Sequence, residues 1–483
     1  MNHLTLLFIL RSFVVLVQGF DVEYCVIGGG PGGLQTAYYL QQDDRDYVVF
    51  EAEDSVGAFY KKYPIHDKLI NTNLKQEYKV TCMYVISAIG LGIPLSLFTL
   101  DTPRHVNYAD LDPADVNKFK GKDVVIFGAG NSAFETAAQL SMYANKVLII
   151  SRGRIKLAFQ THYVGDVRAI NLPFLDTYQL KSLDYQYRDD MNREWRWDDH
   201  QSMFILNKDD TTTAHYFISC LGWQVDKSIF EKELADSWEK YPSIDSFFES
   251  NEQKGLFFAG TLMHSLDHKN SSGGFIHGFR YNIRAMTRMF HCRHRNQVYP
   301  KMRSLHKDGI PRAIGNRLAS TSGLYQMFKF LGDVFLFNAE SDTSLYFEEL
   351  PVAVHNRLDE ATCWRETQWA KEQSNKSEIM TAFVTLEYGE GFSGPGQDTL
   401  RESKGYTGHN FLHPVIRIRR LNDTSPLVEL HLREDITTLF QDDIRKLHEF
   451  FSSFFNSLPA LKIPATWANR TVKVDKATGD KTA

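Results

Sequence analysis

Residues 22–33 read VEYCVIGGGPGG, and this stretch decides the fold of the first part of the chain. Its first six residues are typical of a short buried strand, and a helical pattern runs from Leu34 to Leu40. The turn between them has the GxGxxG spacing of a dinucleotide-binding site. The first glycine allows the tight turn, the second admits a pyrophosphate to the backbone, and the third brings helix and strand together. The predicted binding residues are Gly28, Gly30, Pro31, Gly32 and Gly33. A tight turn without a ligand is the alternative.

An acidic residue follows the next strand. Tyr47–Phe50 is predicted to be that strand, and Glu51 comes directly after it. A carboxylate at this position accepts hydrogen bonds from the ribose hydroxyls of an adenosine. Glu51 therefore joins the predicted binding residues and favours a dinucleotide over an empty turn.

The same unit recurs about 100 residues later. A predicted strand at 123–127 leads into the GxGxxA turn GAGNSA at 128–133, and a helix starts at Phe134. The next strand, 147–150, is followed by Ser-Arg-Gly-Arg at 151–154 in place of an acid. Arginine binds a 2′-phosphate that a carboxylate would repel, so the second site is predicted to take NADPH. The residues predicted to bind it are Gly128, Gly130, Asn131, Ser132, Arg152 and Arg154. The alternative for both arginines is a solvated surface charge.

Two dinucleotide turns, the first followed by an acid and the second by arginine, suggest a flavin oxidoreductase with FAD in the first unit and NADPH in the second. The chain resembles the two-dinucleotide-binding-domain flavoproteins, which include flavin monooxygenases and glutathione-reductase-like enzymes. Segments 84–90, 216–223 and 255–260 match the family's linking strands. The resemblance implies flavin contacts at Gly260 and at Gly274, which opens a helix whose N-terminus faces the ring. Many relatives have an acid where Thr261 stands here.

Longer stretches narrow the resemblance. Residues 161–171, 175–184, 273–281 and 410–415 are similar to the FAD-dependent oxidoreductase domain-containing family known as the endoplasmic-reticulum flavoprotein associated with degradation. The resemblance implies a luminal flavoprotein, FAD and NADPH as cofactors, and endoplasmic-reticulum quality-control and degradation proteins as partners. It also implies a role in the disposal of misfolded glycoproteins.

The chain departs from this family in two places. Only 32 residues separate Glu51 from Tyr84, where the family has a longer segment with further FAD contacts, and the family's retrieval tail is missing. The short segment motivates an alternative function, a non-catalytic scaffold that binds quality-control proteins. A flavin monooxygenase acting on small molecules is another alternative. Its FxGxxxH signature fails, because Thr99 and Asp101 occupy the aligned positions before His105.

The N-terminal segment indicates the cellular compartment, and the composition limits the kinds of partner. Residues 4–17 are mostly apolar, and Val17 and Gly19 fit the positions before a signal-peptide cleavage site. We expect a secretory-pathway protein of the endoplasmic-reticulum lumen without a stable membrane span, and secretion remains open because the retrieval signal is missing. The net charge of −5 excludes a strongly basic nucleic-acid binder. Sequons give weak support for a glycoprotein at Asn270, Asn375, Asn422 and Asn469.

The cysteines and the candidate catalytic residues are less informative. No CxxC occurs, so neither a zinc ribbon, another metal site nor a thioredoxin-type redox pair is predicted. Cys25, Cys82 and Cys220 fall in predicted strands and are expected to be small buried thiols, although a pair between two of the five cysteines is not excluded. No acid or base is assigned. The candidates near the presumed cleft, for which phosphate contact, packing or surface placement is favoured, are His162, Tyr163, Arg168, His264 and His277.

The predicted fold class is α/β, with two Rossmann-like domains and a small C-terminal α+β region. Residues 288–317 are interpreted as a connector, 323–337 and 345–358 as helices, and 379–388, 415–419 and 427–432 as strands. A further helix is expected from 436 to 458. The predicted domains are a signal peptide (1–19), an FAD-binding domain in two parts (20–100 and 217–295), an NADPH-binding domain (101–216), a connector (296–322), the C-terminal domain (323–465) and a flexible tail (466–483).

Overall fold

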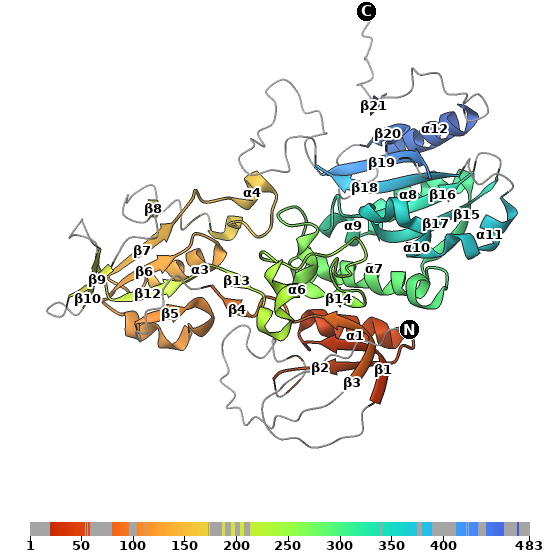
Figure 1. Cartoon of the computed structure of the whole chain (residues 1–483). Coiled ribbons are helices and arrows are strands. Elements are labelled where there is room, and N and C mark those ends of the chain that lie inside the picture. The colour runs from red at the N-terminus through yellow and green to blue at the C-terminus, as the bar shows by residue number, and fades with distance from the viewer. Residues whose placement is uncertain are drawn as a thin grey trace, which may run out of the picture.

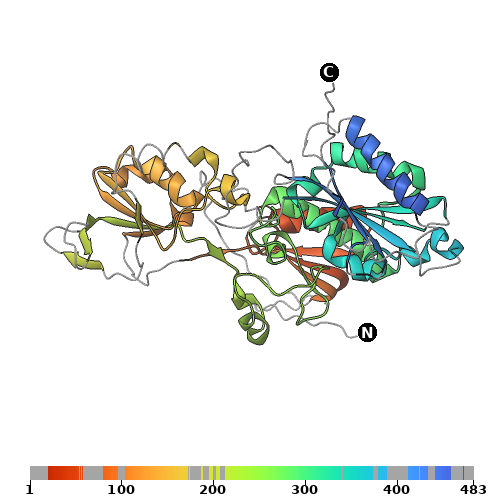
Figure 2. The same ribbon diagram turned by 90° about the horizontal axis from the view of Figure 1, so that it is seen from above.

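A computed structural model describes residues 20–53, 55, 57, 80–95, 104–111, 113–171, 173, 186–188, 195–198, 203–206, 213–338, 341–373, 379–388, 412–421, 423, 425–432, 441–457 and 471–472. The signal peptide and the stretch 175–184 lie outside the described residues, as does most of the short segment after Glu51. Two views show one lobe, orange to yellow, beside a larger body (Figures 1 and 2). In this body, green helix α7 lies between the red N-terminal elements and the green-to-cyan elements of the C-terminal part, whose blue elements lie farther from the helix (Figure 1).

The first sheet carries the first glycine-rich turn. It is parallel, with the order β14-β3-β1-β2. Helix α1 (Pro31–Gln42) follows the turn, starts with a proline in its first turn, and buries Ala37 and Leu40. The strands are β1 (Phe20–Ile27), β2 (Tyr47–Phe50), β3 (Val80–Ser87) and β14 (Leu256–Phe258). The elements before and after β14 are η5 (Lys227–Ile229), α6 (Lys232–Asp236) and η6 (Gly260–Ser265).

The second sheet is also parallel and has the order β5-β12-β6-β7-β8. Both sheets therefore confirm the predicted Rossmann-like fold. The strands are β5 (His105–Asn107), β6 (Asp123–Phe127), β7 (Lys146–Ser151), β8 (Gln186–Arg188) and β12 (Tyr216–Ser219). The helices are η1 (Tyr108–Asp110), η2 (Pro113–Phe119), α3 (Asn131–Leu140), α4 (Ala158–Thr161) and η3 (Ala169–Asn171).

Two small sheets complete this lobe and its link to the body. Strands β4 (Ile93–Pro94) and β13 (Trp223–Gln224) pair antiparallel where the chain enters and leaves the lobe. The other small sheet is antiparallel and consists of β9 (Trp195–Asp198), β10 (Met203–Leu206) and β11 (Thr213–Ala214).

The C-terminal sheet has the order β15-β17-β16-β18-β19-β20-β21 and is antiparallel except for its last pair. Its strands are β15 (Met302–His306), β16 (Leu331–Phe337), β17 (Thr343–Pro351), β18 (Met380–Glu387), β19 (His413–Arg420), β20 (Val428–His431) and β21 (Thr471–Val472). The helices around it are α7 (Ile276–Arg295), η7 (Lys307–Gly309), α8 (Ile310–Ser320), α9 (Gly323–Gln326), η8 (Val352–Arg357), α10 (Leu358–Thr362), η9 (Trp364–Glu366), α11 (Gln368–Glu372) and α12 (Gln441–Ser457).

Both faces of the central strand β16 are buried, whereas edge strand β15 is partly exposed. Val334 and Leu336 of β16 pack into the core shared with α7 and the first sheet, whereas Phe335 and Phe337 pack into the core under α8 and α12. The helices predicted at 323–337 and 345–358 are therefore wrong over most of their length, because β16 and β17 occupy them. A strand buried on both faces has no polar alternation and cannot be distinguished from a buried helix by its pattern.

The interpretation of residues 288–317 as a connector is also wrong. Helix α7 continues to Arg295, β15 forms the edge of the C-terminal sheet, and Pro311 lies in the first turn of α8. Several basic residues of this stretch are half-buried and paired with acids, as Arg288 is with Glu349, Arg293 with Glu249 and Arg317 with Asp333. The predictions of strands at β18, β19 and β20 and of a helix at α12 are confirmed.

The cysteines form two disulfides. Cys25 is joined to Cys82, and Cys292 near the end of α7 is joined to Cys363 after α10. The expectation of free thiols at Cys25 and Cys82 is therefore wrong, since a tertiary pairing cannot be read from the sequence. Cys220 is free and buried as expected, and burial raises the pKa of its thiol to about 12.

A buried charge network fastens the C-terminal sheet to α7. Asp333 is 2% exposed and accepts hydrogen bonds from the Arg317 guanidinium and the Tyr346 hydroxyl, both at 2.7 Å. Its other oxygen accepts the backbone N–H of Glu349 at 2.9 Å. The Glu349 carboxylate in turn pairs with Arg284 and Arg288 of α7 and with Arg317 of α8.

Replacing Asp333 by alanine tests this network. Asp333→Ala leaves Arg317 without its main partner in a buried site, so we expect the free energy of unfolding to fall by about 3–5 kcal/mol. Urea denaturation followed by tryptophan fluorescence measures the change. Asp342→Ala is the matched control, because it removes an exposed ion pair with Lys307 from the edge of the same sheet and should leave the midpoint unchanged. Equal midpoints for both variants would contradict the assigned role of Asp333.

Candidate functional site

The first glycine-rich turn has space for a ligand at one position and close packing at the others. A side chain at Gly33 would collide with the carbonyl oxygen of Gly28, so the third glycine permits the contact between strand and helix. A Cβ at Gly32 would lie 2.8 Å from the Cα of Gly260. A Cβ at Gly30 would meet no protein atom within 4 Å, which is the open backbone that a pyrophosphate needs. The turn therefore fits the group that the sequence predicts.

Glu51 lies beside this turn. One of its carboxylate oxygens accepts the backbone N–H of Gly29 at 2.7 Å, and the other accepts that of Glu53 at 3.1 Å. The acid is held at the end of β2, next to the start of α1. The structure thus brings Glu51 and the glycines together, and the predicted hydrogen bonds to a ribose stay a prediction.

The residues predicted to contact a flavin lie on the same side of the first sheet. Gly260 begins η6 directly after β14 and has a φ of 72°. Gly274 precedes α7, and its Cβ would lie 2.8 Å from the ring of His264. The Thr261 hydroxyl is 3.4 Å from the Gly274 carbonyl oxygen, so this threonine joins η6 to the loop before α7 instead of offering an acid.

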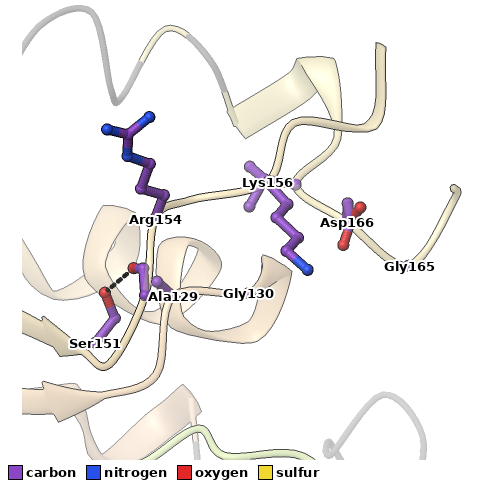
Figure 3. A pocket seen from close by; sticks show the side chains of 9 residues that line it. Ala129, Gly130, Ser151, Arg154, Lys156, Gly165 and Asp166 are labelled. Carbon is purple, nitrogen blue, oxygen red and sulfur yellow. Dashed lines mark hydrogen bonds between the residues drawn. The ribbon is translucent and has the colours of Figure 1, made fainter. Parts of the chain in front are cut away.

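The second turn borders a cavity of about 230 Å³. Figure 3 shows Arg154 and Lys156 on the loop after β7, Asp166 with Gly165 on the facing segment, and Ala129 and Gly130 at the turn; the Arg154 side chain points away from that turn. A Cβ at Gly130 would meet nothing within 4 Å, whereas one at Gly128 would collide with the Cys220 carbonyl. The cavity therefore combines open backbone, a helix start, two cations and the one carboxylate of Asp166, and its excess of positive charge suits a phosphorylated nucleotide.

Other predicted residues of this turn have different positions. Asn131 holds the facing loop, because its amide donates to the Asp166 carbonyl at 2.8 Å and its oxygen accepts the Arg168 N–H at 2.9 Å. The Ser151 hydroxyl donates to the Gly153 carbonyl at 2.9 Å. Arg152 and Ser132 are not among the cavity-lining residues, and their contact with NADPH stays a prediction.

The cavity-lining residues that sequence reasoning did not name as binding residues include two charged side chains, Lys156 and Asp166. Lys156 lies beyond the arginines that the motif singles out, and Asp166 comes from a loop that the fold brings across. The basic character of residues 152–156 was the available signal for Lys156. No local pattern indicates Asp166, since its position depends on the hydrogen bonds that Asn131 makes to the loop.

Of the candidate catalytic residues, the structure brings only two together. The Tyr163 hydroxyl lies 3.1 Å from Nε2 of His264. His162 stacks on Tyr388 with ring centroids 4.0 Å apart. Arg168 forms an exposed ion pair with Glu135 at 2.5 Å. His277 is exposed and stacks on Phe275, whose ring also contacts those of His264 and Tyr163.

Among the described residues, no three His, Cys, Asp or Glu side chains are placed to hold a metal ion. None of the helices in the described ranges combines the length and apolar character needed to cross a membrane.

Comparison with known proteins shows which families and relatives the chain resembles. Residues 75–260 match the pyridine nucleotide-disulphide oxidoreductase family, and residues 26–74 match the NAD(P)-binding Rossmann-like domain. FAD-dependent oxidoreductase domain-containing protein 2 of Mus musculus is 30% identical over 82% of this chain and 75% of its own length. The protein of the same name from Danio rerio is 26% identical over the same shares. The bacillithiol disulfide reductase structure from Bacillus cereus is 15% identical, covers 56% of this chain and 98% of its own, and has a TM-score of 0.39.

Two glycine substitutions separate folding from cofactor binding at the first turn. Gly30→Ala meets no protein atom, so we expect a folded protein, but its methyl group occupies the approach of the pyrophosphate. Overpacking of about 1–3 kcal/mol corresponds to FAD binding that is weaker by about fivefold to about 150-fold. Flavin fluorescence titration measures the affinity. Gly33→Ala is the comparison, since it forces strand and helix apart and should lower stability itself. FAD affinity unchanged in Gly30→Ala would contradict the assigned site.

Proposed function

The chain belongs to the family of FAD-dependent oxidoreductase domain-containing protein 2, and from this membership we propose that it takes electrons from NADPH in the endoplasmic-reticulum lumen. It is an FAD-dependent oxidoreductase that uses FAD and NAD(P)H. We further propose a role in the degradation of misfolded glycoproteins, with quality-control proteins as partners. The observation that carries the electron-transfer proposal is the pair of open glycine turns on separate parallel sheets, one beside an acid and the other beside cations.

The preference for NADPH rests on charge at the end of β7. Arg154 and Lys156 line the cavity, and Ser151 occupies the position where the first unit has Glu51. A 2′-phosphate binds favourably to guanidinium and ammonium groups and is repelled by a carboxylate. The second site therefore favours the phosphorylated nucleotide, while the acid of the first site favours free ribose hydroxyls.

The residues of the chain position the two nucleotides and leave the hydride chemistry to them. When bound, the flavin accepts a hydride from the nicotinamide, and this step needs orientation more than an acid or base. The backbone at Gly30 and Gly130 admits the phosphates, and Asn131 fixes the loop that closes the second cavity. The α7 N-terminus provides a positive dipole end next to Gly274.

The proposal of a luminal location is supported by the disulfides. Cys292–Cys363 spans 71 residues and ties α7 to the segment after α10. Structural disulfides persist in oxidising compartments and are rare in the cytosol. The predicted signal peptide and sequons point the same way. Endoglycosidase sensitivity and co-localisation with a luminal marker in cells would test the location, and cytosolic fractionation of an unglycosylated chain would contradict it.

One feature of the sequence supports the alternative of a non-catalytic scaffold. It depends on the short segment after Glu51, most of which lies outside the described residues. A scaffold would fold without taking up FAD. The monooxygenase alternative has no added support from His105, which lies in β5 with its Nε2 2.8 Å from the Ser219 hydroxyl.

Removing the cations tests the nucleotide preference. Lys156→Ala and Arg154→Ala each delete a charge that pairs with the 2′-phosphate, so we expect KM for NADPH to rise about tenfold and KM for NADH to change less than about twofold. Steady-state reduction of an artificial quinone with each nucleotide measures both constants. Lys122→Ala is the matched control, because this exposed lysine precedes β6 at the opposite end of the sheet. Equal changes for NADPH and NADH would refute the NADPH assignment.

A further inference from the structure

A hydrogen-bonded chain of three side chains joins the NADPH-binding lobe to the FAD-binding body. His264 and Asp267 are each 1% exposed, and the ring Nδ1 lies 2.8 Å from the carboxylate. On the other side of the ring, Nε2 lies 3.1 Å from the Tyr163 hydroxyl. His264 and Asp267 belong to the body, whereas Tyr163 follows α4 of the lobe. The chain therefore crosses between the two nucleotide-binding units.

The direction of the hydrogen bonds follows from the carboxylate. With the ring proton of His264 on Nδ1, that N–H donates to Asp267, and Nε2 accepts from the Tyr163 hydroxyl. Burial raises the pKa of Tyr163 to about 12, so this hydroxyl keeps its proton at neutral pH. In this arrangement Tyr163 donates, Asp267 accepts, and the His264 ring does one at each nitrogen.

At the body end of these three hydrogen-bonded side chains, Asp267 is held by the loop that precedes α7. The second oxygen of Asp267 accepts the Ser271 hydroxyl at 2.5 Å and the Gly273 backbone N–H at 2.9 Å. Gly274 then lies against the His264 ring. The group that orients the histidine is therefore the same group that shapes the loop in front of the α7 N-terminus.

At the other end of the three side chains, Tyr163 lies behind the wall of the nucleotide cavity. Gly165 lines that cavity, and a Cβ on it would lie 2.6 Å from Cζ of Tyr163. The next residue, Asp166, also lines the cavity and is held by Asn131. A short segment, 163–166, thus forms a wall of the NADPH-binding cavity and contacts the flavin-binding body.

The left-handed backbone conformation of His162 sets the direction of this segment. His162 has a φ of 58° and ends α4, so that its own ring stacks on Tyr388 while Tyr163 reaches His264. A non-glycine residue in this region is strained and persists only when its surroundings hold it. Two adjacent side chains of the lobe therefore contact two different parts of the body.

We propose that Tyr163, His264 and Asp267 form a relay of hydrogen bonds that holds the NADPH-binding lobe against the FAD-binding body in the arrangement for hydride transfer. This inference rests on the proposed function and names Tyr163 and His264 as positioning residues for it. In the step that they serve, NADPH gives up a hydride and becomes NADP⁺, and the flavin gains the two electrons and the proton. The relay itself gives up no proton, because it acts on the distance and angle between the nucleotides.

Tyr163→Phe tests the relay, because it removes one half-buried hydroxyl and leaves the ring packing. In anaerobic stopped-flow with the FAD-loaded full chain, we expect the limiting rate of flavin reduction by NADPH to fall about tenfold. NADP⁺ affinity, measured by calorimetry on the FAD-free chain, should stay within about twofold, because the hydroxyl points away from the cavity towards His264. Hydrogen exchange of the FAD-free chain should become faster at residues 161–168.

Tyr241→Phe is the matched control. Its ring meets the same His264 ring edge-on, with centroids 5.7 Å apart, so it removes a hydroxyl from the same cluster without breaking the relay. We expect it to reduce flavin at the native rate. Equal rates for Tyr163→Phe and the native chain, or equal slowing by both variants, would overturn the relay while the proposed function stands. A native chain whose bound FAD is not reduced by NADPH would overturn the proposed function and the relay with it.

Discussion

The burial of helix α7 between two sheets is the constraint on which the rest of the structure depends. Its C-terminal half packs on the first sheet, where Phe290 stacks on Tyr24 and His294 stacks on Tyr84. The Tyr24 hydroxyl is 2.5 Å from Nδ1 of the His294 ring. Arg284 and Arg288 of the same helix pair with Glu349 of the C-terminal sheet. The flavin-binding sheet and the C-terminal sheet consequently share one core.

This constraint distinguishes the two nucleotide-binding units. The first is built into the shared core, and its turn lies close to the loop that opens α7. The second is joined to the body through the β4–β13 pair and through the contacts of His162 and Tyr163 (Figure 1). The placement of the NADPH-binding lobe therefore depends on a few polar and aromatic contacts, and the flavin-binding unit depends on a large apolar core.

Charged residues also distinguish the two nucleotide-binding sites. Glu51 follows β2 in the first unit, whereas Ser151 stands at the equivalent position of the second unit and the cations Arg154 and Lys156 follow it. In the proposed function, the acid and the cations select different riboses, so that two similar units take FAD and NADPH in different roles. The free Cys220 lies beneath the second turn as a buried packing residue, and its raised pKa keeps it a neutral thiol.

The sequence predicted both turns and both parallel sheets, because glycine spacing between a strand and a helix is a local requirement. It did not predict β16 and β17, whose two buried faces remove the alternation that marks a strand. It named Tyr163 and His264 only as separate candidates. Their contact joins residues 101 positions apart, and Asp267 stood in no motif. Long-range pairings of this kind, like the two disulfides, arise from packing that no local pattern encodes.

The most direct test of this account is an anaerobic titration of residues 20–483 with NADPH, followed in the visible spectrum. The account predicts a purified protein with a bound-flavin spectrum that bleaches with one equivalent of NADPH. A folded, colourless protein that does not take up added FAD would contradict it, and the scaffold function would then be favoured.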